Sequence, residues 1–336
     1  MKLNVIAKII TFGLIIPAMF GASLVAVKAY YSPLGDGLQM PTVAVGTSDM
    51  QVIPTATAIT IAALAQESVC GESGVWNVLV LGTDSVEMRG NPGADFVRMM
   101  RVDFPNRQVT LFAFPPDLWV DTSTLGLTNP TIQSTYLGMV FHEARLRSTH
   151  TILRDVMLDG TNASATMLFN NFTITTNYYL TVDLSQVPMM VDAIGGVPLN
   201  VPQTITDPWI GTIIPSGPQT LNGTQFIAYA RAIPDSDFAR IQRNDLLMEA
   251  LREKLLDPTV WGQIPQLYSQ FNGMIATNFS PEQINHLSCL LKQVPLNAIV
   301  KERIKQEWTS PGPMPDSLYW DKTQVLNQLK TLNFIP

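Results

Sequence analysis

The sequence predicts an α/β domain in which helices cover the faces of a sheet. From residue 75 onward, segments with the pattern of buried strands alternate with helical segments, an order unlike that of a helix bundle or a β-sandwich. Hydrophobic residues make up 46% of the 336 residues, which is enough to bury a sizeable core. No repeat of roughly 20–50 residues is visible, which argues against a solenoid.

Five segments have the pattern of strands. Residues 75–81 form a mostly apolar run, and residues 96–103 and 108–114 follow it. A turn at Pro105, Asn106 and Arg107 separates the second and third runs, so we expect them to pair as a hairpin. Two further strands are predicted at residues 178–182 and 197–201.

Six segments have the pattern of helices. Gly195 and Gly196 terminate one of them, and Ser280 has the side chain of an N-cap for another. The predicted helices cover residues 142–158, 184–194, 221–232, 236–256, 264–275 and 281–292.

The N-terminal segment predicts a membrane anchor. Lys2 and Lys8 precede an uncharged run over residues 9–27, which Lys28 closes. A helix of that length spans about 28 Å, enough to cross the bilayer core. The positive-inside rule places residues 1–8 in the cytoplasm and the rest of the chain outside the cell. A cleaved signal peptide is the alternative, because small residues surround Ala26.

Residues 28–74 have the composition of a linker, with recurring prolines and little charge. Cys70 ends this linker, and Cys289 lies near the other end of the chain. A disulfide between them is chemically permitted outside the cell, but spacing alone leaves it open. The two cysteines form no CxxC pair, which excludes a cysteine zinc cluster.

Charge and composition exclude several classes of function. The net charge is −6, whereas a nucleic-acid-binding domain is normally basic, so we expect no nucleic-acid partner. The histidines lack a metal-ligand spacing, and the chain contains no GxSxG, GxxxxGK[ST] or GxGxxG motif.

Two aspartates lie where a sheet of this kind binds ligands. Asp84 follows the first predicted strand, and Asp95 precedes the second after a loop rich in glycine and proline. Two carboxylates together suit Mg²⁺. Equally, Asp84 could cap a turn while Asp95 only begins a strand, and the residues alone leave both interpretations open.

A second group of charges lies at the start of the predicted helix over residues 236–256. Asp237, Arg240 and Arg243 share one stripe of that helix, and Arg231 ends the preceding helix. Arginines at such a junction can clamp phosphates, near a helix N-terminus that itself attracts anions. A solvated stripe of ion pairs is the alternative.

These pieces, in this order, resemble the LytR–CpsA–Psr family of membrane-anchored cell-envelope phosphotransferases. The resemblance runs from about residue 75 to residue 256 and is weaker beyond. It rests on WNVLVLGTDS (76–85), ADFVRMMRVDFPNRQVTLFAFPPDLWV (94–120), DAIGGVPLNVP (192–202), GPQTLNGTQFIAYAR (217–231) and DSDFARIQRN (235–244).

The resemblance implies an α/β/α domain with a central mixed sheet and a hydrophobic cavity for a polyprenyl lipid. It divides the chain into a cytoplasmic tail (1–8), an anchor (9–27), an extracellular linker (28–74), the catalytic domain (75–258) and a helical C-terminal extension of that domain (259–336). The implied location is the cell membrane, with a single span and an extracellular domain.

The implied activity is transfer of a glycopolymer from a polyprenyl-pyrophosphate carrier to a wall acceptor such as peptidoglycan, with Mg²⁺ on the pyrophosphate. The expected metal ligands are Asp84 and Asp95. The expected pyrophosphate-binding residues are Arg231, Arg240, Arg243 and Asn244. The expected catalytic residues are Asp237, Arg240 and Arg243, with Asp237 orienting the arginines or assisting proton transfer.

The chain departs from the family pattern at several charged positions. Family members usually carry arginines where this chain has Gly93, Pro116 and Ile233, and glutamine where it has Asn244. A single preorganised donor is worth about 3 kcal/mol in such a site, so these losses matter. Arg89, Arg98 and Arg101 are the candidates to compensate.

Two functions from different classes therefore remain. The surviving aspartates and arginines favour an active, divergent phosphotransferase. The residues at positions 93, 116 and 233 favour a catalytically weak relative that binds polyprenyl-linked glycans or wall components as an accessory or scaffold.

Overall fold

A computed structural model describes the chain over residues 28–38, 69–83, 93–123, 143–150, 160–206, 211–232, 236–261 and 274–336. The predicted anchor over residues 9–27 and its cytoplasmic tail lie outside these ranges. Within them, the structure contains no helix whose length and apolar character would let it span a bilayer.

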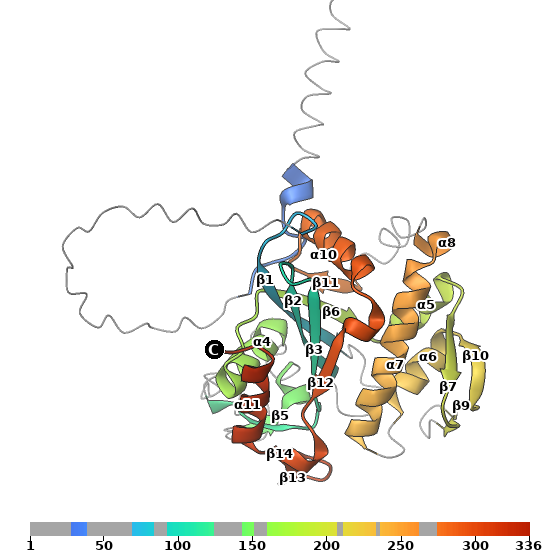
Figure 1. Cartoon of the computed structure of the whole chain (residues 1–336). Coiled ribbons are helices and arrows are strands. Elements are labelled where there is room, and N and C mark those ends of the chain that lie inside the picture. The colour runs from blue at the N-terminus through green and yellow to red at the C-terminus, as the bar shows by residue number, and fades with distance from the viewer. Residues whose placement is uncertain are drawn as a thin grey trace, which may run out of the picture.

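The centre of the molecule is a six-stranded mixed sheet (Figure 1). Its strand order is β11-β6-β1-β2-β3-β12. Strand β1 pairs antiparallel with β2 and parallel with β6, while β2 and β3 form the predicted hairpin. The strands are β1 (Val75–Thr83), β2 (Ala94–Asp103), β3 (Gln108–Phe114), β6 (Tyr178–Asp183), β11 (Ile275–Thr277) and β12 (Val300–Arg303).

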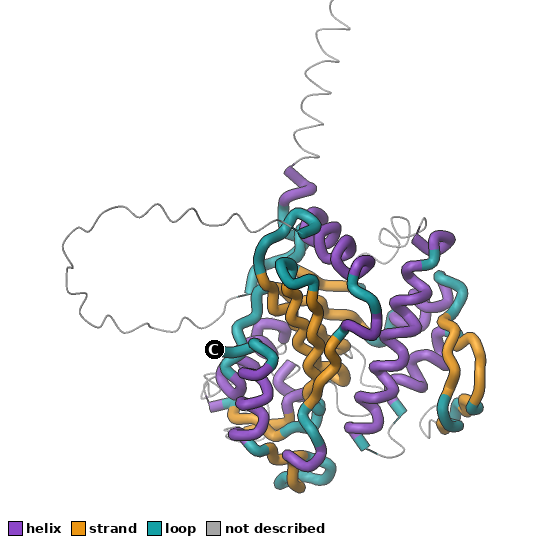
Figure 2. The backbone as a smooth tube through the Cα atoms, viewed as in Figure 1, coloured by secondary structure: helices purple, strands orange, loops and turns teal. Residues whose placement is uncertain are grey.

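One face of the sheet is covered by α4 (Gly160–Phe172) and α11 (Lys322–Thr331). Alternate residues of the central strands, such as Leu79 and Met99, are fully buried against Leu168 and Phe172 of α4 and Leu329 of α11. Both helices lie on the same side of the sheet in Figures 1 and 2.

The opposite face is covered by α10 (Pro281–Gln293) and by a layer of α5 (Val187–Ala193), α6 (Gly223–Arg231) and α7 (Asp237–Leu256). Trp76, Val78 and Val102 of the sheet belong to the same buried cluster as Leu290 of α10. Helices α5 to α7 pack on one another and on a ribbon of β7 (Val197–Val201) and β10 (Gly217–Leu221). The predicted layered α/β fold is therefore confirmed.

Local sequence signals set the ends of these helices. The Ser236 side chain accepts a hydrogen bond from the Ala239 backbone N–H and begins α7. Ser280 caps α10 in the predicted way, within a capping box completed by Gln283. After α5, Gly195 and Gly196 adopt φ values of +77° and +79°, which glycine reaches without strain.

Short ribbons and helical turns complete the fold. They are β4 (Trp119–Asp121) with β5 (Glu143–Arg145), β8 (Ile205–Thr206) with β9 (Ile213–Ile214), β13 (Thr309–Pro311) with β14 (Leu318–Trp320), and α8 (Pro258–Trp261), η2 (Leu296–Ala298) and η3 (Gln306–Trp308).

The structure corrects two predicted helices. Residues 143–145, expected at the start of a helix, form β5 because they pair with β4, and the Trp119 indole donates a hydrogen bond to the Glu143 carboxylate. Ile275, expected at the end of a helix, instead begins β11 and pairs with Val182.

The C-terminal region differs from a purely helical extension. Residues 259–336 contain α10 and α11, but they also supply β11 and β12, which form the two edges of the central sheet. The sequence did not decide whether Cys70 and Cys289 form a disulfide. The structure contains this bond, which joins Cys70 to Cys289 of α10 with their Cα atoms 5.7 Å apart. It ties the segment before β1 to the helix that covers this end of the sheet.

Candidate functional site

An apolar cavity of about 490 Å³ lies between the sheet and the helical layer. One stripe of α7 enters it, with Asn244 followed by Leu247, Met248, Leu251 and Leu255 at helical spacing. The rest of the apolar wall comes from β1, β2, β6, β11, α5 and α6, together with Leu184 and Ile194. Besides Asn244, the polar residues of the lining are Asp95 and Arg231.

Asp95 is the centre of the charges at this cavity. It lies near the start of β2 and is only 5% exposed. Arg231, at the end of α6, places its Nη2 atom 3.1 Å from Asp95 Oδ2. The guanidinium of Arg147 contacts Asp95 Oδ1, and Nη1 of Arg240 lies 3.9 Å from the same oxygen. Three arginines from different segments therefore meet at one buried carboxylate.

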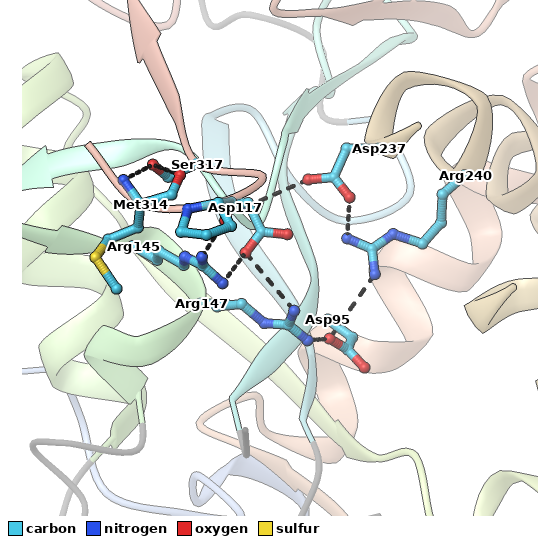
Figure 3. A network of polar contacts seen from close by, with 9 residues as sticks. Asp95, Asp117, Arg145, Arg147, Asp237, Arg240, Met314 and Ser317 are labelled. Carbon is cyan, nitrogen blue, oxygen red and sulfur yellow. Dashed lines mark hydrogen bonds and ion pairs between the residues drawn. The ribbon is translucent and has the colours of Figure 1, made fainter. Parts of the chain in front are cut away.

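The first turn of α7 carries the predicted acid–arginine pair. Arg240 is 1% exposed, and its Nη2 atom lies 2.5 Å from Asp237 Oδ1. The Asp117 backbone N–H points at Asp237 Oδ2 across 3.4 Å. Asp237 thus links α7 to the segment after β3 and holds Arg240 toward Asp95 (Figure 3).

Asp117 is a buried acid that the sequence did not single out. Its Oδ1 atom lies 3.3 Å from Arg145 and 3.7 Å from Arg147. Burial and the nearby negative charge of Asp237 raise its pKa to about 6, although the positive charges of Arg240 and Arg145 oppose this shift. Asp117 can therefore change its protonation state near neutral pH.

These side chains form one connected network, which we call the arginine–aspartate cluster. Figure 3 labels its members other than Arg231. It contains more guanidinium groups than carboxylates, so positive charge is in excess and favours an anionic ligand. Its members are Asp95, Asp117, Arg145, Arg147, Arg231, Asp237 and Arg240.

The other predicted residues lie close to this cluster. Arg243 is buried, and its guanidinium donates to the backbone carbonyls of Tyr229 and Ala232, which holds the end of α6 against α7. Asn244, the next residue of α7, is also buried and lines the cavity. Asp84 lies outside the described residues.

Two of the arginines considered as compensation are engaged elsewhere. Arg98 pairs with Asp245 at 2.8 Å and donates to the Ile241 carbonyl on α7. Arg101 pairs with Asp103 and donates to the Asn333 carbonyl. Arg89 and Ile233 lie outside the described residues.

Arg145 and Arg147, like Asp117, are residues of the cluster that sequence reasoning missed. Both lie in a segment predicted as helix, where their spacing of two has no common face. Arg145 is the last residue of β5, whereas Arg147 lies in the helical segment over residues 146–150 and its backbone N–H donates to the Pro116 carbonyl. No periodicity in the sequence therefore indicated that both side chains would reach the cluster.

The described residues give a limited set of metal ligands. They contain no group of three or more acidic, histidine or cysteine side chains placed to hold a metal ion. At the predicted magnesium site they supply the Asp95 carboxylate, which three guanidinium groups already surround. A hard cation there needs further oxygens, from Asp84 or from the ligand.

Comparison with known proteins gives one family and a consistent fold. The sequence pattern of the LytR_cpsA_psr family matches residues 48–333. The chain is 25% identical to the regulatory protein MsrR of Staphylococcus aureus over 209 residues, which cover 61% of this chain and 57% of MsrR, less than two thirds of that relative.

Solved structures share the architecture. B. subtilis TagV superposes with a TM-score of 0.60 at 18% identity, covering 79% of this chain and 100% of TagV. A structure described as TagT bound to LIIa-WTA superposes with a TM-score of 0.56 at 15% identity, covering 79% of this chain and 91% of TagT. At these identities the likeness concerns the fold.

Proposed function

Because the chain belongs to the LytR–CpsA–Psr family, we propose that it transfers a glycopolymer from a polyprenyl-pyrophosphate carrier to a cell-wall acceptor such as peptidoglycan. The observation that carries the proposal is the junction of the apolar cavity with the arginine–aspartate cluster. Asp95 and Arg231 belong to both. A ligand with an apolar chain and an anionic head fits such a junction. The presence of LIIa-WTA in the TagT structure agrees with a wall-polymer substrate.

The proposal gives each side chain a task. The cavity holds the first part of the polyprenyl chain, since apolar burial contributes about 0.8 kcal/mol per CH₂ group. Arg231 and Arg240 bind pyrophosphate oxygens, with the charge-assisted hydrogen bonds that guanidinium groups make to phosphates. Arg243 and Asn244 position these groups, and Asp237 orients Arg240, which it contacts at 2.5 Å.

The proposed reaction is a phosphoryl transfer. A hydroxyl oxygen of the acceptor attacks the phosphorus that carries the glycopolymer. The bond from that phosphorus to the bridging oxygen breaks, polyprenyl phosphate leaves, and the hydroxyl proton passes to a base or to water. Such reactions depend chiefly on positioning and charge neutralisation, which buried arginines supply. Asp237 and Asp117, at the edge of the cluster, are the candidate proton acceptors.

We also propose that Mg²⁺ assists this step, with Asp95 and Asp84 as its protein ligands. The support is chemical: Asp95 lies beside the proposed pyrophosphate position, and phosphate oxygens complete the coordination that Mg²⁺ prefers. The ion would neutralise charge on the phosphates. Chelation of Mg²⁺ should then abolish turnover, and adding it back should restore turnover.

The predicted anchor over residues 9–27 is part of the proposal. A polyprenyl carrier resides in a membrane, and an anchored extracellular domain meets it there. The disulfide between Cys70 and Cys289 agrees with an oxidising location.

A second candidate is a binding protein without turnover. Gly93 and Pro116 favour it, because neither supplies the arginine expected at its position. Such a protein would bind the lipid-linked polymer through the same cavity and cluster but would release no polyprenyl phosphate.

The test is a turnover assay on the full-length chain in detergent. We would supply a polyprenyl-pyrophosphate-linked sugar, Mg²⁺ and a peptidoglycan fragment, and measure release of polyprenyl phosphate. Arg240→Gln should abolish release. Arg101→Gln is the matched control, because Arg101 pairs with Asp103 outside the cluster. Binding without release across metals and acceptors would support the second candidate.

A further inference from the structure

The backbone of Arg147 lies between Gly93 and Pro116. These are the two described positions at which family members usually carry arginine and this chain does not. Its backbone N–H donates to the Pro116 carbonyl at 2.8 Å. On the other side, its carbonyl oxygen lies against Gly93, at 2.6 Å from the place that a Cβ atom on Gly93 would occupy. The backbone of Arg147 thus touches position 116 and position 93 together.

The Arg147 side chain reaches the same carboxylates as the rest of the cluster. It is 11% exposed, contacts Asp95 Oδ1 and lies 3.7 Å from Asp117 Oδ1. Figure 3 shows its guanidinium between these two acids, with Arg240 on the far side of Asp95. Its charge is therefore directed into the site.

Any side chain at position 93 competes with this arrangement. A Cβ atom 2.6 Å from the Arg147 carbonyl oxygen is closer than real contacts allow, so the segment carrying Arg147 would have to move. An arginine at position 93 and Arg147 in its present place exclude each other. The absence of a side chain at Gly93 thus leaves the space in which the backbone of Arg147 lies.

We propose that Arg147 is a diphosphate-binding residue of this site and supplies the positive charge that Gly93 and Pro116 do not. The inference rests on the proposed function, because the ligand class is the lipid-linked diphosphate. In the free protein, Asp95 and Asp117 hold the Arg147 guanidinium in place. When a diphosphate enters, its oxygens become additional acceptors for the same planar donor group. Arg145 is a positioning residue, because it contacts Asp117 at 3.3 Å.

The test separates recognition of the head group from recognition of the chain. We would measure the dissociation constants of geranylgeranyl pyrophosphate and of geranylgeraniol, which lacks phosphate, on the full-length protein in detergent. Arg147→Gln should weaken binding of geranylgeranyl pyrophosphate by about 10- to 100-fold and leave the affinity for geranylgeraniol unchanged. Arg147→Lys keeps the positive charge but loses the planar, forked set of guanidinium donors. Its pyrophosphate affinity should therefore fall between those of the parent protein and Arg147→Gln. Arg101→Gln should match the parent for both ligands.

The outcomes are distinct. Equal pyrophosphate affinity for the parent protein and Arg147→Gln would overturn the inference while leaving the proposed function intact. Equal loss for both ligands would assign Arg147 a structural role and would also overturn it. If the parent protein binds the pyrophosphate no better than the alcohol, the proposed function itself fails.

Discussion

Asp117 gives the sharpest prediction about the electrostatics of the site. Its pKa is raised from 3.8 to about 6 by burial and by the charge of Asp237. The folded state therefore binds this proton more tightly than the unfolded chain does. The resulting stabilisation is fully present below the unfolded pKa and is lost as the pH rises through about 6. At about 1.36 kcal/mol per pKa unit, the loss amounts to about 3 kcal/mol.

Asp117→Asn removes this pH-dependent loss. The difference in unfolding free energy between the variant and the parent should rise in favour of the variant, by up to about 3 kcal/mol from about pH 4 to pH 7. Urea unfolding of the full-length chain in detergent, followed by tryptophan fluorescence at several pH values, measures this difference.

Asp103→Asn is the matched control, because its pH dependence has the opposite sign. Burial acts to raise the pKa of Asp103, but hydrogen bonds from Arg101 and Asn106 outweigh burial and lower it. The stability that the Asp103 carboxylate contributes is present above its unfolded pKa and is lost as the pH falls through the lowered folded pKa, so this variant should lose more stability at neutral pH than in acid. A constant difference for Asp117→Asn across the same pH range would refute the account of the Asp117–Asp237 pair.

Three further predictions address packing. Gly93→Ala should displace the segment of Arg147, destabilise the fold by about 1–3 kcal/mol in urea unfolding and weaken pyrophosphate binding; unchanged binding would contradict this. Replacing both cysteines, Cys70→Ser and Cys289→Ser, removes a cross-link between residues that are 219 positions apart. The free energy of unfolding should fall by about 2–5 kcal/mol in urea unfolding. Ala230→Trp should fill part of the cavity and weaken the binding of geranylgeraniol and of geranylgeranyl pyrophosphate to the same extent. Isothermal titration measures both affinities, and weaker binding of the pyrophosphate alone would contradict this prediction.

Most of the fold was predictable because its strands and helices have strong local signals. The hairpin of β2 and β3, strand β7 and the capped start of α7 are where periodicity, turn residues and N-caps place them. The edge strands were not predictable in this way. Strand β12 has only four half-buried residues, VKER, and is a strand because β3 offers a free edge for parallel pairing. That pairing joins residues nearly two hundred positions apart, which local sequence does not encode.

The residues of the site also differ in how far local sequence indicated their positions. Asp237 and Arg240 share one stripe of a helix with a clear start, and Arg231 ends the helix before it, so their grouping could be anticipated from helix spacing and order. That Arg231 and Arg240 meet Asp95 was expected only from the family resemblance. Arg147 could not be anticipated, because its placement depends on β5 pairing with β4. It also depends on the missing Cβ of Gly93. The absent arginine at position 93 was visible in the sequence as a loss, whereas its role as space for another arginine appears only in three dimensions.

The two parts of the site should contribute separately to recognition. Apolar burial in the cavity depends on chain length and is indifferent to the head group, since it scales with the area removed from water. The cluster discriminates among head groups, because its guanidinium groups form ion pairs with a phosphate but not with a neutral alcohol. One face of α7 joins these parts, with Arg240 in the cluster one turn before Asn244 and Leu247 in the cavity wall. A rigid helix of this kind fixes how far the diphosphate lies from the first prenyl unit. Changes in the cavity should therefore alter affinity for all prenyl ligands, whereas changes in the cluster should alter the preference for phosphate.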